Sequence, residues 1–329
     1  MKELEGHFRG KKAIVTGGAG FVGCHLVETL VDLGAEVVSV DDYSAGKRHN
    51  LAFAAGKPNF RDLAADVCDR AAMDAALEGA TFVFHNAASK KTVCLKDPAR
   101  DLAVNAGGTL NLLELSVKHG VQKFVHASTG SVYGEPHVFP TTEDHPLRPV
   151  SYYGVSKLGG ERYVDVFNHL HGLDTTILRY FHVYGPKQES NEFGGVVSIF
   201  LRNTLENKPL TIFGDGTQLR SFTWVKDLVR ANLLAAITPR ARGQVYNCAS
   251  GIQVTVKELC EGILGLAGEE VEGRIEYKDW TVGDIKFFDV SNQKIREHLG
   301  MEFERDFWGK MRQTFDEFVA YLKRFELAR

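Results

Sequence analysis

The chain has 329 residues, of which 44% are hydrophobic and 25% are charged, and its formal net charge is −3. This balance is that of an ordinary globular chain with enough apolar residues for a sizeable core, and the slight negative charge argues against nucleic acid or an anionic membrane as a partner. The five cysteines are scattered and odd in number, so we expect reduced thiols, no metal site and a cytoplasmic protein. The first residues, MKELEGHFRGKK, lack an apolar signal core, and no apolar run is long enough to span a bilayer.

Short apolar runs alternate with helical patterns in the first part of the chain. Expected strands cover 12–17, 36–42, 59–67, 81–88, 123–129 and 174–185, and expected helices cover 21–34, 71–80, 98–120 and 151–172. Such alternation predicts an α/β fold with a doubly wound parallel sheet. After about residue 184 the rhythm breaks, which predicts a cofactor-binding domain over 1–183 and a smaller C-terminal α/β lobe over 184–329, with a later strand near 244–249 returning to the sheet.

Three glycines follow the first expected strand at a fixed spacing. Gly17, Gly20 and Gly23 lie between KAIVT and an expected helix, the arrangement with which a Rossmann fold brings backbone and a helix N-terminus up to a pyrophosphate. Asp41 ends the next strand, where a carboxylate can accept hydrogen bonds from the adenosine ribose. Because Asp41 would repel a phosphate on that ribose, NAD is favoured over NADP.

A tyrosine and a lysine in SYYGVSK carry the expected chemistry. Tyr153 and Lys157 are four residues apart, which places them on one face of a helix. An ammonium group beside a phenol favours the phenolate, so we expect Lys157 to lower the pKa of Tyr153 and make it a base for a substrate alcohol. A hydroxyl from HASTGS, for which Thr129 is the candidate, can hydrogen-bond the same oxygen.

Eight motifs occur in one order: TGGAGFVG, VDDYSAG, ADV, HNAA, STGSVYG, YYGVSK, LRYFHVYGP and GDGTQLRSFTWVKD. Through them the chain resembles the extended short-chain dehydrogenases, and specifically the NAD-dependent epimerase/dehydratase family of the UDP-galactose 4-epimerase kind, from Lys11 to about Gly300. The resemblance implies a tightly bound NAD that takes a hydride from a sugar carbon, usually C4, and returns it to the other face after the keto sugar has rotated.

The resemblance also implies roles for individual residues. It makes Thr129, Tyr153 and Lys157 the catalytic group. It assigns the cofactor to Gly17, Gly20, Phe21, Val22, Gly23, Asp41, Asp42, Ser44, Gly46, Asp66, Val67, Ala87, Ala88, Lys90, Asn105, Tyr153, Lys157 and Tyr180. It assigns the nucleotide sugar, with UDP as the expected nucleotide, to Lys90, Thr129, Tyr153, His182, Val197, Thr211, Phe213, Arg220 and Asp284.

The two residues after Thr129 help to choose the reaction. Dehydratases of this kind have an Asp–Glu pair there and decarboxylases keep the Glu, whereas this chain has Gly130 and Ser131. Neither supplies a carboxylate for chemistry at C5, so 4-epimerisation is the favoured activity. The alternatives are a 4,6-dehydratase, a decarboxylase, a C2, C3 or C5 epimerase, a 4-ketoreductase and, in another class, an NAD-binding scaffold without activity.

Further departures from the family pattern concern the substrate. His182 replaces the usual Asn, and it either contacts the sugar or phosphate, where it can carry charge near neutral pH, or packs as a neutral residue. Ser221 replaces the usual Asp beside Arg220, and Thr281 replaces a second diphosphate arginine. The apolar stripes in 98–120 and 151–172 are compatible with a homodimer formed through a four-helix bundle, and equally with the core of one chain.

Overall fold

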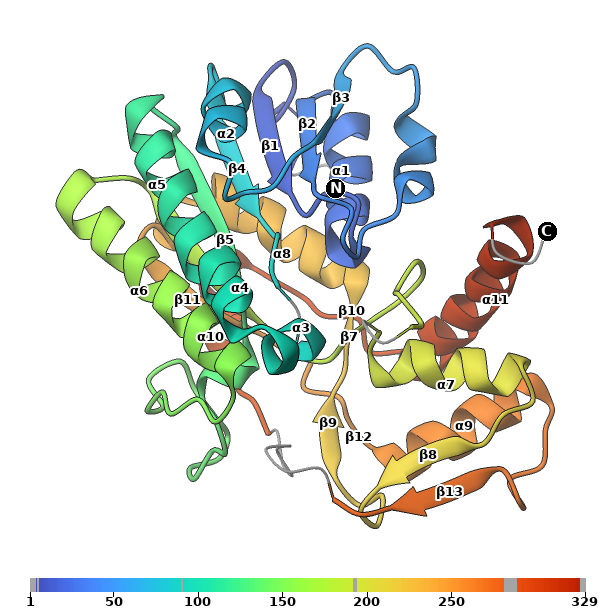
Figure 1. Ribbon diagram of the computed structural model, residues 1–329. Helices are drawn as coiled ribbons and strands as arrows, with labels where there is room; N and C mark the ends of the chain where they lie inside the picture. Colours follow the sequence, from blue (N-terminus) through green and yellow to red (C-terminus); the bar gives the residue numbers. More distant parts are fainter. Residues whose placement is uncertain (1–3, 5, 90, 192–193, 281–288, 326–329) are drawn as a thin grey trace.

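The centre of the structure is a parallel sheet (Figure 1). The computed structural model describes residues 4, 6–89, 91–191, 194–280 and 289–325. The strands of this sheet are β1 (Lys12–Thr16), β2 (Glu36–Asp41), β3 (Phe60–Ala64), β4 (Phe82–His85), β5 (Lys123–Thr129), β6 (Thr175–Tyr180) and β11 (Gln244–Cys248). Their order is β11-β6-β5-β4-β1-β2-β3, and every pair is parallel. The chain therefore winds outward in both directions from the β1/β4 boundary, which confirms the predicted doubly wound α/β fold.

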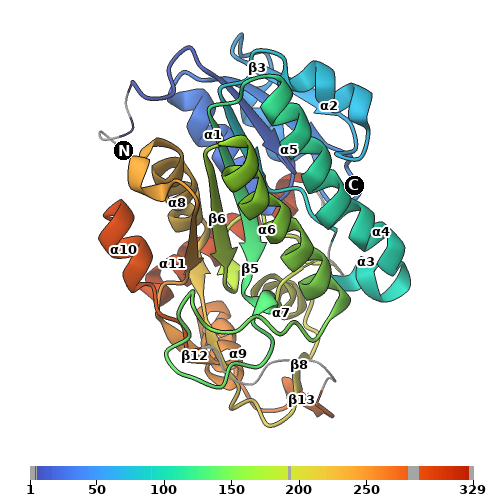
Figure 2. The same ribbon diagram turned by 90° about the vertical axis from the view of Figure 1, so that its left-hand side faces the viewer.

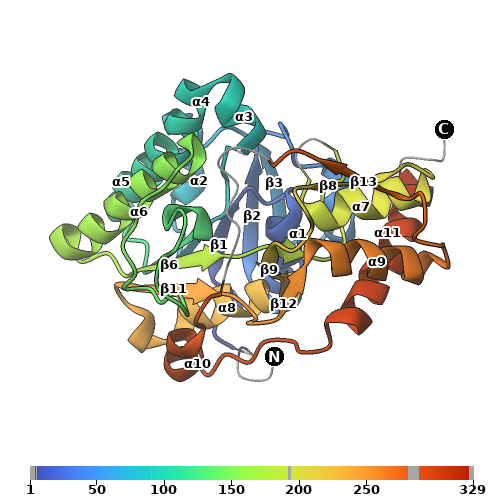
Figure 3. The ribbon, with the colours of Figure 1, turned by 90° about the horizontal axis from the view of Figure 1, so that it is seen from below.

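Helices cover both faces of the sheet (Figures 2 and 3). Successive strand residues point to opposite faces, so Ala13 and Val15 of β1 join one apolar core while Ile14 joins the other. The first core is closed by α1 (Phe21–Asp32) and α8 (Val225–Ile237). The second is closed by α2 (Arg70–Leu77), α5 (Thr109–Lys118) and α6 (Tyr152–His171).

Two expected elements differ from the structure. The helix expected over 98–120 is α4 (Pro98–Leu102), a π-helical segment η3 (Ala103–Gly108) and then α5. The strand expected over 174–185 ends at Tyr180, because His182 takes a left-handed backbone conformation with φ of 31°. The chain then leaves the central sheet and forms β7 (Val183–Tyr184), which pairs with β10 (Thr223–Trp224).

The C-terminal lobe has a core of its own beside the sheet domain (Figure 3). Aromatic residues of β7 and β10 pack there against the helices α7, α9 and α11. The elements of the lobe are α7 (Val196–Leu205), β8 (Leu210–Phe213), β9 (Leu219–Ser221), β12 (Gln253–Thr255), α9 (Val256–Ala267), β13 (Ile275–Lys278) and α11 (Phe307–Phe325). The remaining helices are α3 (Lys91–Lys96) and α10 (Gln293–Leu299), with shorter turns η2 (Arg48–Ala54), η4 (Gly130–Val132) and η5 (Pro239–Ala241). Within the described ranges, no helix is long and apolar enough to cross a membrane.

A buried ion pair joins the last strands to α6. Arg179 on β6 donates from Nε and Nη2 to the two carboxylate oxygens of Glu161, at 3.0 and 2.8 Å, and from Nη1 to the Tyr133 hydroxyl at 2.7 Å. The Tyr133 hydroxyl in turn donates to Asn247 on β11 at 2.7 Å. Both charges of the pair are almost fully buried, so each depends on the other for its solvation.

Replacing Arg179 with Met should therefore be strongly destabilising, since Glu161 would keep a buried charge without a cation. We expect a loss of about 3–5 kcal/mol in the free energy of unfolding, measured by urea denaturation. The matched control is Arg70→Met, because Arg70 forms an exposed pair with Glu114, and its loss should cost less than about 1 kcal/mol. Equal losses in the free energy of unfolding for the two substitutions would show that burial does not increase the contribution of the Arg179 pair to stability.

Candidate functional site

The glycine loop between β1 and α1 is built by close backbone contacts. Gly17 has φ of 66°, a region that side chains other than glycine rarely enter, and its N–H donates to the Val40 carbonyl at 2.8 Å. A Cβ on Gly23 would press against the Gly17 carbonyl, 2.8 Å from its carbon. Gly20 is the N-cap of α1 and, among the described residues, no side chain caps this end. The N–H groups of the first turn are thus available to an anion.

This loop forms one end of a cavity of about 350 Å³ along the carboxyl ends of the strands, the place where doubly wound sheets bind ligands. Of the cofactor residues predicted from the sequence that the structure describes, all but Asn105 line it, while Lys90 lies outside the described residues. The lining predicted residues are Gly17, Gly20, Phe21, Val22, Gly23, Asp41, Asp42, Ser44, Gly46, Asp66, Val67, Ala87, Ala88, Tyr153, Lys157 and Tyr180.

Asp41 at the end of β2 holds the loop as well as facing the cavity. Its Oδ2 accepts from the Ala19 N–H and its Oδ1 from the Tyr43 N–H, both at 2.9 Å. Burial raises the pKa of Asp41 above its ordinary value, against these two hydrogen bonds. A carboxylate oxygen can accept a second hydrogen bond, so Asp41 retains capacity for ribose hydroxyls. Gly46 passes so close to the carboxylate that a Cβ there would lie 2.7 Å from Oδ1.

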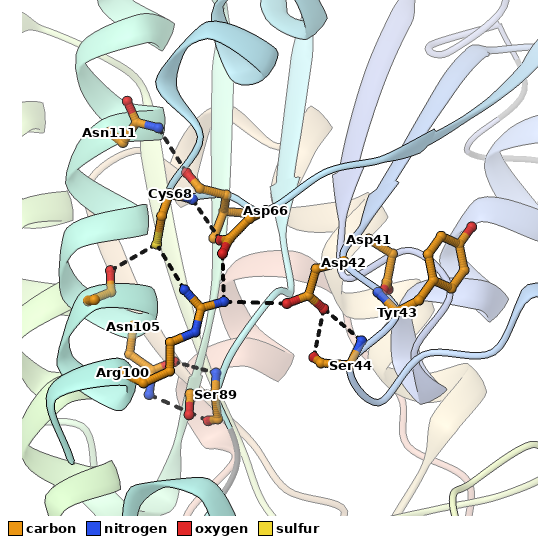
Figure 4. A network of polar contacts seen from close by, with 12 residues as sticks. Asp41, Asp42, Tyr43, Ser44, Asp66, Cys68, Ser89, Arg100, Asn105 and Asn111 are labelled. Carbon is orange, nitrogen blue, oxygen red and sulfur yellow. Dashed lines mark hydrogen bonds and ion pairs between the residues drawn. The ribbon is translucent and has the colours of Figure 1, made fainter. Parts of the chain in front are cut away.

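An arginine that sequence reasoning missed bridges the same end of the cavity (Figure 4). Arg100 of α4 lies between Asp66, whose carboxylate is 2.6 Å from Nη2, and Asp42, at 3.4 Å. It also lines the cavity. The pKa of Arg100 is raised above its ordinary value by Asp66 and Asp42 despite partial burial. No local pattern marks Arg100, because its two partners follow β2 and β3 and meet it only in the folded chain.

Several buried polar atoms at the cavity are without a hydrogen-bond partner in the part of the chain that the structure describes. They belong to Asn86 (Nδ2), Ser89 (Oγ) and Ser128 (Oγ). Unpaired buried polar groups are costly, and a ligand with polar edges would satisfy them. Together with the uncapped helix end and Asp41, these groups fit a dinucleotide such as NAD.

Two of the catalytic candidates, Tyr153 and Lys157, line the far wall of the cavity, and the third, Thr129, contacts Tyr153. Lys157 is only 2% exposed, and its ammonium donates to the Ala127 carbonyl at 2.7 Å. Tyr153 hydrogen-bonds the Thr129 side chain. Thr129 Oγ1 also lies 3.2 Å from Ser131 Oγ.

The expectation that Lys157 lowers the pKa of Tyr153 in the protein alone is wrong. Burial, with a contribution from the negative charge of Asp101, raises the pKa of Tyr153 to about 12. Burial lowers the pKa of Lys157 to about 8, against the raising effects of Glu161 and Asp101. The tyrosine is therefore a phenol near neutral pH, and further positive charge in the cavity would lower its pKa.

The described substrate candidates apart from Thr129 and Tyr153 lie away from this cavity, in or near the C-terminal lobe. Val197 of α7 is buried in the core of the C-terminal lobe. Arg220 is buried on β9, and its Nη1 donates to the Leu219 carbonyl at 3.0 Å. Phe213 at the end of β8 is half exposed and lines a second hollow with Tyr277, Lys278 and Trp280. Thr211 is partly buried on β8, and Asp284 and Thr281 lie outside the described residues.

Of the two alternatives for His182, the structure agrees with the packed, neutral residue and not with one that carries charge near neutral pH. Burial, and then the nearby charge of Arg220, lowers the pKa of His182 to about 3. Its ring packs edge-on against Phe222, with centroids 5.9 Å apart. Any contact of His182 with a substrate would therefore be that of a neutral imidazole.

Comparisons with known proteins agree with this geometry. Residues 13–249 match the model of the NAD dependent epimerase/dehydratase family. The UDP-glucose 4-epimerase of Mycolicibacterium smegmatis is 37% identical over 301 residues, which cover 88% of this chain and 93% of that protein. The crystal structure of UDP-glucose 4-epimerase from Thermotoga maritima with UDP-glucose has a TM-score of 0.89 and 37% identity, covering 94% of this chain and 99% of that one. A dTDP-glucose 4,6-dehydratase from Streptomyces venezuelae, with NAD bound, has a TM-score of 0.90 at 28% identity, covering 97% and 100%.

Replacing Gly23 with Ala tests the glycine loop directly. The added methyl collides with backbone rather than with a flexible side chain, so the loop must shift and its N–H groups lose their alignment. We expect NAD to be held at least about tenfold more weakly, measured as nucleotide released per protein after dialysis and acid precipitation.

Gly265→Ala on α9 is the control, because a Cβ there would meet nothing within 4 Å. It should leave the NAD content unchanged. Full retention of NAD by the Gly23 variant would contradict the role assigned to this backbone contact.

Proposed function

This chain belongs to the NAD-dependent epimerase/dehydratase family, and from that premise we propose that it is a nucleotide-sugar 4-epimerase acting on a UDP-sugar. The Mycolicibacterium smegmatis and Thermotoga maritima relatives are UDP-glucose 4-epimerases, and the latter was crystallised with UDP-glucose. The family also includes the dehydratase above at a similar TM-score, so similarity alone does not choose the reaction.

The observation that carries the choice is the packing at Gly130. A Cβ at this position would lie 2.7 Å from Cδ1 and 2.9 Å from Cζ of the Phe181 ring. Phe181 is itself buried, in a small core with Val132 and Tyr133. No acidic side chain can enter here without displacing that ring, and the next residue is Ser131. The carboxylate that elimination at C5 and C6 requires is therefore absent beside Thr129 among the described residues.

The chain's own residues then perform the proton transfer. When bound, NAD would supply a positively charged ring, a hydride acceptor for the oxidation and a hydride donor for the return step. Tyr153 removes the proton from the C4 hydroxyl as the keto sugar forms, and donates it back to the C4 oxygen after the sugar has turned its other face. Thr129 hydrogen-bonds the phenol and orients it, and Lys157 adds a positive charge behind it.

The proposal is tested by incubating the holoenzyme with UDP-glucose, UDP-N-acetylglucosamine and UDP-glucuronate in D₂O and analysing the products by chromatography and mass spectrometry. We expect, for at least one of them, a product of unchanged mass and new retention time with no carbon-bound deuterium. That result means that the hydride left and returned to the same carbon. Deuterium incorporation with loss of water or CO₂ would replace the proposal with dehydration or decarboxylation.

Tyr153→Phe should slow this conversion by about 10³-fold, because the phenol is the group that moves the proton. The neighbouring Tyr152 is 58% exposed on the same helix, so Tyr152→Phe is a matched control that should retain activity. Full activity of Tyr153→Phe would remove the assigned base.

We also propose that the chain forms a homodimer through α5 and α6. These helices lie side by side on one face of the molecule (Figure 2). Exposed apolar side chains recur along α6 at spacings of three, four and eight residues, which puts them in one stripe; they are Tyr152, Val155, Tyr163, Val166 and Leu170. An exposed stripe of this length is typical of a helix that packs against a partner.

Val166→Glu should convert the dimer into a monomer, because a charge would be buried at the middle of the stripe. Sedimentation velocity at micromolar concentration measures the change. Val138→Glu, at an apolar residue in the loop before α6 that is even more exposed than Val166, should leave the dimer intact. A wild-type chain that sediments as a monomer would contradict the proposal at once.

A further inference from the structure

Asp101 on α4 is a buried carboxylate that no sequence motif marked. It is 1% exposed. Its Oδ2 accepts from the Ser156 hydroxyl at 2.5 Å, and its Oδ1 accepts from Asn105 Nδ2 at 3.0 Å. Neither partner is charged, and no cation forms an ion pair with Asp101 within the residues that the structure describes. A buried charge without a direct cation is expensive, so its presence beside the catalytic pair calls for a reason.

The hydrogen bonds of Asp101 connect three walls of the cavity. Ser156 belongs to α6, one residue before Lys157. Asn105 lies in the π-helical segment η3, donates also to Ser156 at 3.0 Å, and accepts from the Ser89 N–H at 2.9 Å. Ser89 lies in the cavity loop after β4. One carboxylate thus fixes the helix of Tyr153 and Lys157 against both the π-helix and the loop.

The negative charge of Asp101 also affects the pKa of Tyr153 and of Lys157. It raises the pKa of Tyr153 and is the second-largest cause of that shift, after burial. It also raises the pKa of Lys157, together with Glu161 and against the larger effect of burial. Both pKa values rise because a nearby negative charge disfavours a phenolate and favours an ammonium.

Other titratable groups face the same pair from the surrounding elements. Cys94 of α3 raises the pKa of Tyr153, as Asp101 does but to a lesser extent. Glu161 is held by Arg179. His85 of β4 and His126 of β5 face Lys157, and burial lowers the pKa of both histidines, to about 3 for His85 and well below the ordinary value for His126. The histidines are therefore neutral through the working pH range and do not oppose the negative charge of Asp101.

We propose that Asp101 is a positioning residue whose negative charge sets the pH range in which Tyr153 and Lys157 work together, while its hydrogen bonds hold α6 against η3. The inference rests on the proposed function, in which Tyr153 is the base and Lys157 its cationic partner. A purely structural role would require only the hydrogen bonds, and the two roles differ in what they do to a pH profile.

Asp101→Asn keeps the shape and removes the charge. The loss of a negative charge lowers the pKa of both groups, so the acidic limb of kcat/KM, where Tyr153 loses its proton, and the alkaline limb, where Lys157 loses its proton, should both move to lower pH. We expect each limb to move by about one pH unit, measured on the holoenzyme with UDP-glucose. A lower plateau with both limbs in place would overturn the proposal in favour of a structural role.

Two controls separate charge from packing. Ser156→Ala removes a hydrogen bond without changing charge, and it should lower the plateau while leaving the limbs where they are. Asp316→Asn removes one negative charge from an exposed position on α11, and it should change neither. If either control moves both limbs as Asp101→Asn does, the specific role of Asp101 is excluded. Should Asp101→Asn fail to fold by circular dichroism, Asp101→Ser makes the same prediction with less bulk.

A second readout does not depend on the substrate or the reaction. The tyrosinate absorbance of Tyr153 is obtained as the difference between proteins with and without Tyr153→Phe, in the wild-type and the Asp101→Asn backgrounds. At a fixed alkaline pH below the midpoint, the Asp101→Asn protein should hold about tenfold more tyrosinate at this position. An unchanged fraction overturns the inference whatever the enzyme acts on. A tenfold rise together with no epimerisation of any sugar nucleotide supports the inference and refutes the proposed function.

Discussion

The contact on which the cofactor end of this molecule depends is the approach of Gly23 on α1 to the Gly17 carbonyl. Helix and loop touch there backbone to backbone, and the Gly17 N–H is held by the end of β2. This contact aims the first turn of α1 into the cavity at the carboxyl edge of the sheet. A few tenths of an ångström would be enough to misalign N–H groups that act only over hydrogen-bond distances. The loop therefore needs glycine because its backbone contacts leave no room for a side chain, and not because the loop must be flexible.

At the other end of the cavity the constraint is electrostatic. The phenol of Tyr153 and the ammonium of Lys157 line the cavity, and the carboxylate of Asp101 is buried behind them. Burial pushes the pKa of the tyrosine up and that of the lysine down, so near neutral pH the tyrosine is an uncharged phenol while most of the lysine remains an ammonium. Further positive charge in the cavity would lower the pKa of the tyrosine and favour its action as a base. In this arrangement ligand binding and activation of the tyrosine become one event.

The sequence predicts those features that are local. Glycine spacing, strand and helix alternation and the Tyr153–Lys157 interval each lie within a few residues, and the doubly wound sheet follows from them. It could not predict Arg100, whose partners Asp42 and Asp66 are far away along the chain, nor the buried position of Asp101. It also missed the split of the strand at His182 and the π-helical segment at Asn105, because both are imposed by packing against other elements rather than by local preference. The pKa of Tyr153 was misjudged for the same reason, since burial is a property of the fold.

Such packing also determines which side chains can stand beside the candidate catalytic residues. Phe181 follows β6 and fills a small core with Val132 and Tyr133, and the face of its ring occupies the space that a side chain at Gly130 would need. Tyr133 is in turn bonded to Arg179, so the ring lies beside the buried ion pair that fixes β6 to α6. An acid for elimination could be introduced at Gly130 only by reshaping this core. Under the proposed function, the reaction is specified less by a catalytic residue that is present than by an aromatic side chain that leaves no room for another.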